Sequence, residues 1–228
     1  MKNPVFVALD LDDESRVLEL AKELGPLAGG LKLGPRMINR GGKAFVQKVA
    51  EHGPVFIDQK FSDIPSTMES AIRTAFESGA SFATIHALAG PEAMKLLAKV
   101  EAELNREREF RILVVTIVTS FNDDNLPAVL KGKTASELVM GLAEEAYSCG
   151  LKSFVCSPFE ASKLKERFND AFLVTPGIRP SGSDLNDQKR VTTPKEALNK
   201  GASAMVIGRP IVEADDPKKS LEDILSSL

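Results

Sequence analysis

Apolar runs and amphipathic stretches alternate along the whole chain. Short apolar runs predict strands at residues 4–10, 30–34, 55–60, 81–88, 111–119, 152–157, 171–175 and 202–207. Apolar residues at helical spacing follow each run and predict helices at residues 15–24, 37–50, 66–78, 91–104, 134–149, 160–168, 194–200 and 216–228. This alternation predicts an α/β fold with a parallel sheet, and eight repeats favour a single-domain (β/α)8 TIM barrel over residues 1–228. No G-x-G-x-x-G motif follows the first strand, which disfavours a dinucleotide-binding fold.

Polar residues recur at one place in this pattern, the carboxyl end of a predicted strand. They are Asp10, Lys32, Asp58, Lys60, His86, Thr119, Ser157, Gly177 and Arg209. In a barrel these strand ends meet on one face, which is where active sites lie. Burying four charged groups near one mouth costs too much unless opposite charges pair, and two acids with two lysines allow that pairing.

The densest group of charges is the segment 58–67, which follows the apolar run 55–57. Side chains alternate along a strand, so Asp58 and Lys60 are expected to point the same way. Asp63 follows in the loop, and a proline at the next helix start is well tolerated. A surface ion-pair cluster is the alternative interpretation, and such clusters contribute little stability. The position of these charges at the end of a buried strand favours a functional site.

The neighbouring carboxylates limit what Lys60 can do. A lysine nucleophile must lose its proton, whereas Asp58 and Asp63 favour the ammonium form. A charged lysine suits a general acid, or a cation that stabilises a developing carbanion. These residues therefore predict proton delivery to carbon, or decarboxylation, and we expect no cofactor.

The second half of the chain predicts a phosphate site. Barrel enzymes commonly bind phosphate in the loops after the seventh and eighth strands. Glycine lets backbone N–H groups approach an anion, and arginine adds a charge-assisted fork. Gly208 and Arg209 alone are compatible with a simple turn, but the loop at 176–180 makes phosphate binding the better interpretation. The candidate ligands are Arg179, Gln188, Gly208 and Arg209.

Composition narrows the class of protein. The 228 residues carry a net charge of −3 without a basic block, which argues against a nucleic-acid surface. No apolar run approaches the ~20 residues of a membrane span, and the first residues lack the pattern of a signal peptide. Cys149 and Cys156 have neither metal-binding spacing nor the density of a disulfide framework. We expect a cytoplasmic protein without a bound metal.

Together the motifs resemble those of the orotidine 5'-monophosphate decarboxylase family over essentially the whole chain. The matching segments are Ala8-Leu9-Asp10, Lys32-Leu33-Gly34, Asp58-x-Lys60-x-x-Asp63-Ile64-Pro65-x-Thr67, Thr119-Ser120, Thr175-Pro176-Gly177-Ile178-Arg179, Asp187-Gln188-x-Arg190 and Ile207-Gly208-Arg209-Pro210. The resemblance implies cofactor-free decarboxylation of orotidine 5'-monophosphate to uridine 5'-monophosphate, the last step of de novo pyrimidine nucleotide biosynthesis. It also implies a homodimer with shared active sites.

The resemblance further implies a role for each motif residue. Lys60 donates a proton to C6 of the pyrimidine, and Asp58 lies against the substrate carboxylate. Asp63 comes from the other subunit and completes a catalytic network of alternating charges with Lys32, Asp58 and Lys60. The implied substrate-binding residues are Asp10, Lys32 and, from the other subunit, Thr67 at the ribose, Thr119 at the pyrimidine edge, Arg179, Gln188, Gly208 and Arg209 at the phosphate, and in addition Asp58, Ile64, Pro65 and Ser120. The polar segment 181–193 resembles a loop that closes over the phosphate.

Two other functions remain open on sequence alone. Magnesium-dependent sugar-phosphate decarboxylases and aldolases use the same barrel and share the Asp-x-Lys-x-x-Asp core. The Ile64-Pro65-x-Thr67 extension, with Gln188 and Arg209, favours the orotidine branch. A catalytically inactive barrel that binds a nucleotide or a protein partner is the other alternative, and the intact charged core argues against it.

Overall fold

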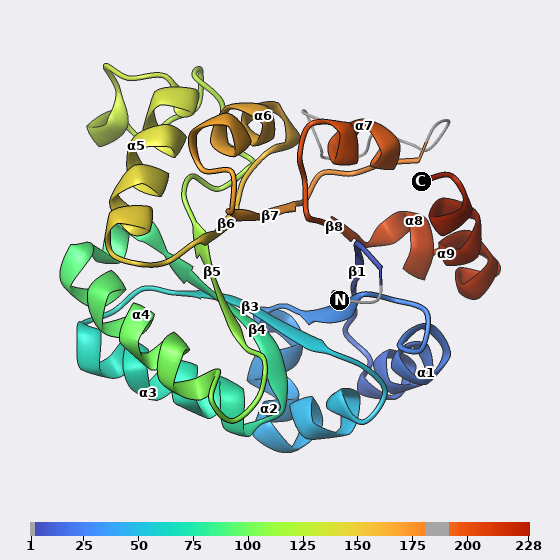
Figure 1. Cartoon of the computed structure of the whole chain (residues 1–228). Helices are drawn as coiled ribbons and strands as arrows, with labels where there is room; N and C mark the ends of the chain where they lie inside the picture. Colours follow the sequence, from blue (N-terminus) through green and yellow to red (C-terminus); the bar gives the residue numbers. More distant parts are fainter. Residues whose placement is uncertain (1–2, 181–191) are drawn as a thin grey trace.

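The computed structural model describes residues 3–180 and 192–228. Over these residues, eight parallel strands close into a barrel in the order in which they occur in the chain, and Figure 1 shows the helices outside the ring. The strands are β1 (Val5–Ala8), β2 (Gly30–Leu33), β3 (Val55–Phe61), β4 (Ala80–His86), β5 (Arg111–Val115), β6 (Ser153–Val155), β7 (Phe172–Thr175) and β8 (Ala204–Ile207). The predicted (β/α)8 barrel is confirmed.

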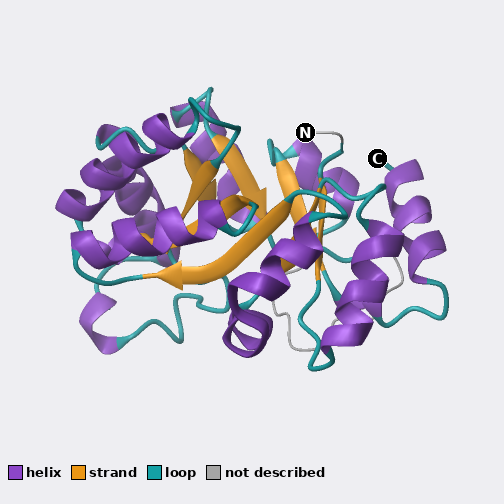
Figure 2. Cartoon of the chain, turned by 90° about the horizontal axis from the view of Figure 1, so that it is seen from below, coloured by secondary structure: helices purple, strands orange, loops and turns teal. Residues whose placement is uncertain are grey.

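Helices follow the strands and cover the barrel, and Figure 2 shows them on both sides of the strands. They are α1 (Glu14–Leu24), α2 (Pro35–Ala50), α3 (Pro65–Glu77), α4 (Pro91–Leu104), α5 (Ala135–Ser148), α6 (Pro158–Arg167), α7 (Pro194–Asn199), α8 (Arg209–Val212) and α9 (Pro217–Ser226), with 3-10 turns at Ala87–Ala89 and Ala128–Leu130. Six of the predicted helices begin within two residues of a proline that occupies the first helical turn, where the missing N–H costs nothing. In the part of the chain that the structure describes, no helix has the length and apolar character to cross a membrane.

Several strands are shorter than predicted, and three differences lie near the carboxyl end of the barrel. The fifth strand ends at Val115 instead of residue 119, because β6 has only three residues and offers no further pairing partner. The fourth strand ends at His86 and passes into a 3-10 turn. The short helix α8, which begins at Arg209, was not predicted, since four residues are too few for a periodic pattern.

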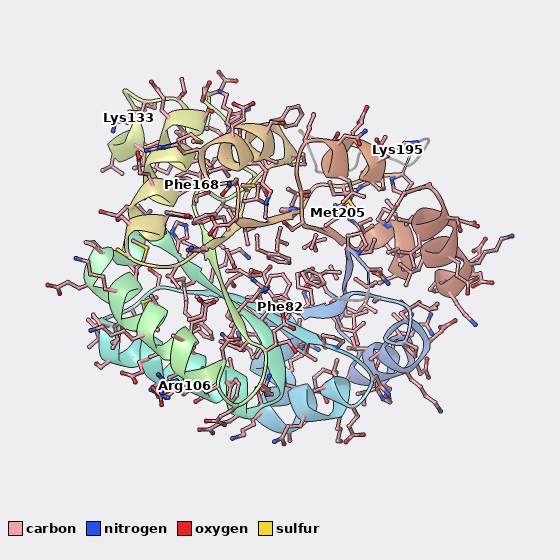
Figure 3. All side chains as sticks on the ribbon, viewed as in Figure 1. Phe82, Arg106, Lys133, Phe168, Lys195 and Met205 are labelled. Atoms are coloured by element: carbon pink, nitrogen blue, oxygen red, sulfur yellow. The ribbon has the colours of Figure 1, made fainter. Side chains whose placement is uncertain are left out.

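The core has two layers. One lies between strands and helices, and it contains Ala83 and Ile85 of β4. The other fills the barrel and contains Phe6, Phe56 and Phe82. Figure 3 shows Phe82 inside the ring of strands. Gly30 belongs to the same interior, and a Cβ at this position would lie 2.8 Å from the Phe6 ring, so only glycine leaves room for that ring.

Candidate active site

Asp58 and Lys60 lie near the carboxyl end of β3, where the strand departs from regular geometry. Pairing with β4 loses its register between Ile57 and Phe61, and Lys60 has a φ of 51°. No other described non-glycine residue has a positive φ. Lys60 Nζ donates to Asp58 Oδ1 at 2.9 Å. The predicted proximity is confirmed, but the pair forms at a bulge and not on a regularly alternating strand.

Four side chains of alternating charge form a row across β1, β2 and β3. Lys32 Nζ donates to both carboxylate oxygens of Asp10 at 2.9 Å and lies 3.6 Å from Asp58 Oδ2. Lys60 extends the row beyond Asp58. The side chains of Lys32 and Asp58 are 8% and 17% exposed, whereas those of Asp10 and Lys60 are 51% and 36% exposed. Each buried charge therefore contacts an opposite charge, which offsets the cost of its burial.

The surroundings of Asp58 keep its carboxyl group ionised. Burial alone would raise its pKa, but the ammonium groups of Lys32 and Lys60 and the hydrogen bonds from Lys60 and Thr84 lower the pKa below its usual value. Burial, and then the charge of Lys60, lowers the pKa of His86, which favours the neutral imidazole. Across residues 3–180 and 192–228, no three His, Cys, Asp or Glu side chains form a group that could hold a metal ion.

An apolar floor and wall surround this row. The rings of Phe6, Phe56 and Phe82 lie inside the barrel with centroids 4.9 to 6.3 Å apart. The row of charges borders a cavity of about 540 Å³ at the barrel mouth. Its apolar wall is formed by Val115, Ile117, Val155 and Val206. Apolar walls exclude water and strengthen the electrostatic interactions of any bound group.

The predicted phosphate ligands at the ends of β7 and β8 line the same cavity. They are Arg179, Gly208 and Arg209, together with Gly177 of the same motif. The Arg179 residue is only 7% exposed, and its Nη1 donates to the carbonyl of Ile178 at 2.9 Å. Gly177 has a φ of 78°, a conformation that favours glycine. Gln188 and the segment 181–191 lie outside the described residues.

The predicted substrate-binding residues Thr119 and Ser120, of which Thr119 was assigned to the pyrimidine edge, have different positions. Thr119 lines the cavity from the loop after β5. Ser120 is exposed and is not part of the cavity wall, and its carbonyl accepts a hydrogen bond from Asn125. Thr119, but not Ser120, therefore lines the cavity that the row of charges borders.

Asp63 and Thr67 line a second hollow of about 410 Å³ beside the cavity, and Lys60 lines both. Asp63 forms no ion pair with any described residue and accepts the N–H of Ile64 at 2.7 Å. Ile64 is 63% exposed and precedes Pro65, the first residue of α3. Within one chain, therefore, neither Asp63 nor Thr67 reaches the cavity that holds the row of charges.

Two residues that were not predicted as site residues contribute to this geometry. Thr84 in β4 is fully buried and lies 3.1 Å from Asp58 Oδ1. A Cβ at Gly34 would lie 2.7 Å from Asp10 Oδ1, so any side chain there would displace that carboxylate. The Lys32-Leu33-Gly34 motif could have identified Gly34 as a site residue. A threonine within an apolar strand, such as Thr84, has no sequence feature that marks it as part of a site.

The sequence of the chain matches a known protein family. Residues 3–224 match the model of the family described as Orotidine 5'-phosphate decarboxylase / HUMPS family. The chain belongs to this family. The resemblance inferred from the motifs is therefore confirmed over nearly the whole chain.

Individual relatives agree with the family assignment. The orotidine 5'-phosphate decarboxylase of Pseudoalteromonas translucida (strain TAC 125) is 40% identical over 226 residues, which cover 98% of this chain and 96% of that protein. That of Sodalis glossinidius (strain morsitans) is 40% identical over 228 residues, which cover 99% of this chain and 90% of that protein. The crystal structure of orotidine 5'-phosphate decarboxylase from Lactobacillus acidophilus has a TM-score of 0.84 and 34% identity, and covers 97% of this chain and 96% of that chain.

Proposed function

We propose that this chain decarboxylates orotidine 5'-monophosphate to uridine 5'-monophosphate, the last step of de novo pyrimidine nucleotide biosynthesis, without a metal or cofactor. Family membership supports the reaction. The observation that carries the proposal is the Lys60–Asp58 pair, 2.9 Å apart, in a cavity that also contains two arginines. One end of this cavity suits an anionic phosphate, and the other suits a reacting carboxylate beside an ammonium group.

The chemistry explains why an ammonium group is needed. When the bond between C6 and the carboxylate breaks, carbon dioxide leaves and the electron pair stays on C6 in the plane of the ring. No adjacent carbonyl delocalises that pair, so the protein must supply positive charge at the reacting carbon. Lys60 Nζ then transfers a proton to C6, and the neutral amine regains a proton from water.

The other charged residues orient the reactants. Asp58 holds Lys60 and lies against the substrate carboxylate, while Lys32 separates Asp58 from Asp10. Asp10 is half exposed and Lys32 is paired with it, which suits hydrogen bonds to the ribose hydroxyl groups. Fixed charges of this kind need no reorganisation when the reaction takes place.

The phosphate end provides binding energy away from the reacting carbon. Arg179 and Arg209 are the proposed ligands of the phosphate, with Gly208 leaving the backbone accessible. Thr119 is the proposed contact of the pyrimidine edge. Binding energy from a remote phosphate can be used to hold the reacting end in a strained or ordered position.

A homodimer completes the proposed site. Asp63 and Thr67 lie outside the cavity of their own chain, in a hollow that Lys60 also lines. The exposed Ile64 beside them is a large apolar side chain at the same edge. This placement supports a second copy that covers the edge and contributes Asp63 and Thr67 to its neighbour's cavity.

The proposal is tested by the loss of orotidine 5'-monophosphate absorbance with purified protein, with and without a strong chelator. We expect loss at the same rate in both samples. Loss only without chelator would show that a metal is required. No loss from folded protein in either sample would contradict the proposal, and phosphorylated keto-sugars with magnesium would then be the substrates to screen.

A further inference from the structure

Thr84 occupies a special position opposite the bulge of β3. Regular pairing stops after Ile57 and resumes at Phe61, and across this gap β4 contributes Thr84 alone. Thr84 is fully buried and lies two residues after Phe82, so both side chains face the barrel interior. A buried hydroxyl group needs hydrogen-bond partners, and those of Thr84 indicate what it does.

The partners of Thr84 are the two ends of the Lys60–Asp58 pair. Its Oγ1 accepts the backbone N–H of Lys60 at 2.8 Å. The same oxygen lies 3.1 Å from Asp58 Oδ1 and 3.5 Å from the carbonyl of Ile57. The hydroxyl has one proton, and the shorter distance and the negative charge make Asp58 the better acceptor. Asp58 Oδ1 therefore accepts from both Thr84 and Lys60 Nζ.

We propose that Thr84 is a positioning residue that sets the geometry between the Lys60 ammonium group and the Asp58 carboxylate. Its hydroxyl takes the place of a strand carbonyl for the Lys60 N–H and fixes one carboxylate oxygen. The backbone of Lys60 has a positive φ, which is unfavourable outside glycine and persists only when neighbouring groups hold it. The inference rests on the proposed function, because the position that Thr84 gives the Lys60 ammonium group matters for delivery of its proton to C6.

Thr84→Val and Thr84→Ser separate the hydroxyl group from the shape of the side chain. Valine keeps the shape and loses both hydrogen bonds, and we expect kcat to fall about 10- to 100-fold with KM changed less than about threefold, since small misplacements of reacting groups have effects of this size. Thr84→Ser retains the hydroxyl and should recover most of the rate. Should Thr84→Val not fold, Thr84→Ala removes the same hydroxyl, and the same expectations apply.

Thr116→Val is the matched control. Thr116 is also fully buried in the barrel region, and its hydroxyl donates to the carbonyl of Val155 at 3.4 Å, away from the row of charges. We expect its kcat to stay within about twofold of the wild type, because it holds neither reacting group. A kcat for Thr84→Val that matches this control, or a Thr84→Ser variant as slow as Thr84→Val, would overturn the inference.

Two further readouts separate this inference from the proposed function. Wild-type protein that does not consume orotidine 5'-monophosphate contradicts the function, whereas active wild type with unaffected Thr84→Val contradicts only the role of Thr84. A crystal structure of Thr84→Val needs no turnover. We expect Lys60 Nζ to lie beyond hydrogen-bond distance of Asp58 Oδ1, or φ of Lys60 to become negative, and an unchanged pair would overturn the inference.

Discussion

Each buried side chain in the row of charges depends on neighbours of opposite charge. Lys32 lies between two carboxylates, and Asp58 lies between two ammonium groups. Removal of one member leaves a buried charge without its partner, which costs more than the intact pair contributes to stability. Substitutions in the row therefore affect both folding and activity, and substitutions beside it are cleaner tests of geometry.

Gly34→Ala tests the position of Asp10. The added Cβ would lie 2.7 Å from Asp10 Oδ1, so the carboxylate must move away from Lys32. Asp10 is half exposed and can move into solvent, so the melting temperature should change little. We expect KM for orotidine 5'-monophosphate to rise about tenfold, which corresponds to the loss of roughly one hydrogen bond to a charged group. Steady-state kinetics measure this change.

Gly141→Ala is the control for that substitution. Gly141 lies in α5, and nothing lies within 4 Å of a Cβ built there. Alanine is the better helix former, so this variant should be slightly more stable and have an unchanged KM. The same KM for Gly34→Ala and Gly141→Ala would contradict the proposed role of Asp10.

The charged residues of the site could be predicted because a barrel brings all its strand ends to one face. Asp10, Lys32, Asp58 and Lys60 were assigned to one mouth on this argument, and the structure confirms the row. The bulge at Lys60 and the hydrogen bonds of Thr84 could not be predicted. Both depend on the register between β3 and β4, which no property of either segment alone determines.

At the level of elements, a partly buried acid joins α4 to β5. Glu101 Oε1 accepts the backbone N–H of Ile112 at 2.6 Å. Burial raises the pKa of Glu101 to about 7, although the bond from Ile112 and the charge of Arg111 oppose this rise. The unfolded chain releases this proton near its usual pKa of 4.5. The contribution of the group to stability is therefore present below about pH 4.5 and is lost as the pH rises to about 7.

Glu101→Gln should remove this pH dependence. Glutamine keeps the oxygen that accepts from Ile112 but cannot ionise. The expected gain in unfolding free energy at pH 8 is on the order of 3 kcal/mol, or several degrees in melting temperature, with little gain at pH 5. Thermal unfolding at both pH values measures this difference. An equal effect of the substitution at pH 5 and pH 8 would exclude a titration of Glu101.

Strand and helix order was predictable because eight short apolar runs alternate with helical spacing. The exact ends were harder to predict, since a strand ends where its neighbour ends. Residues 116–119 continue an apolar, β-branched pattern, yet β6 stops pairing at Val155. This loss of pairing places Thr119 in a loop, from which it lines the cavity.

In the whole molecule, the barrel places its apolar interior and its charged site at different depths. Aromatic rings fill its interior, and the charges gather at the mouth above them. The proposed homodimer accounts for the positions of Asp63 and Thr67, which one chain leaves outside its own cavity. Sequence patterns within one chain do not report which subunit supplies a residue, so the shared site stays a prediction.

Mixed dimers test the shared site. Asp63→Ala and Lys60→Ala chains should each have low activity alone. A dimer with one chain of each kind contains one site with both Lys60 and Asp63 intact, so random mixing should restore about a quarter of the wild-type sites. Activity assays after verified subunit exchange measure this recovery. If verified mixed dimers recover no activity, Asp63 does not act across the interface.

In the proposed mechanism, Lys60 supplies positive charge and a proton to the reacting carbon. The most direct measurement compares the consumption of orotidine 5'-monophosphate by Lys60→Ala and by wild type at equal concentrations of folded protein. We expect a loss in kcat on the order of 10³-fold, the size typical of a lost general acid or electrostatic stabiliser. A Lys60→Ala rate within about tenfold of the wild type would exclude Lys60 as the proton donor, since general acid catalysis alone contributes more than that.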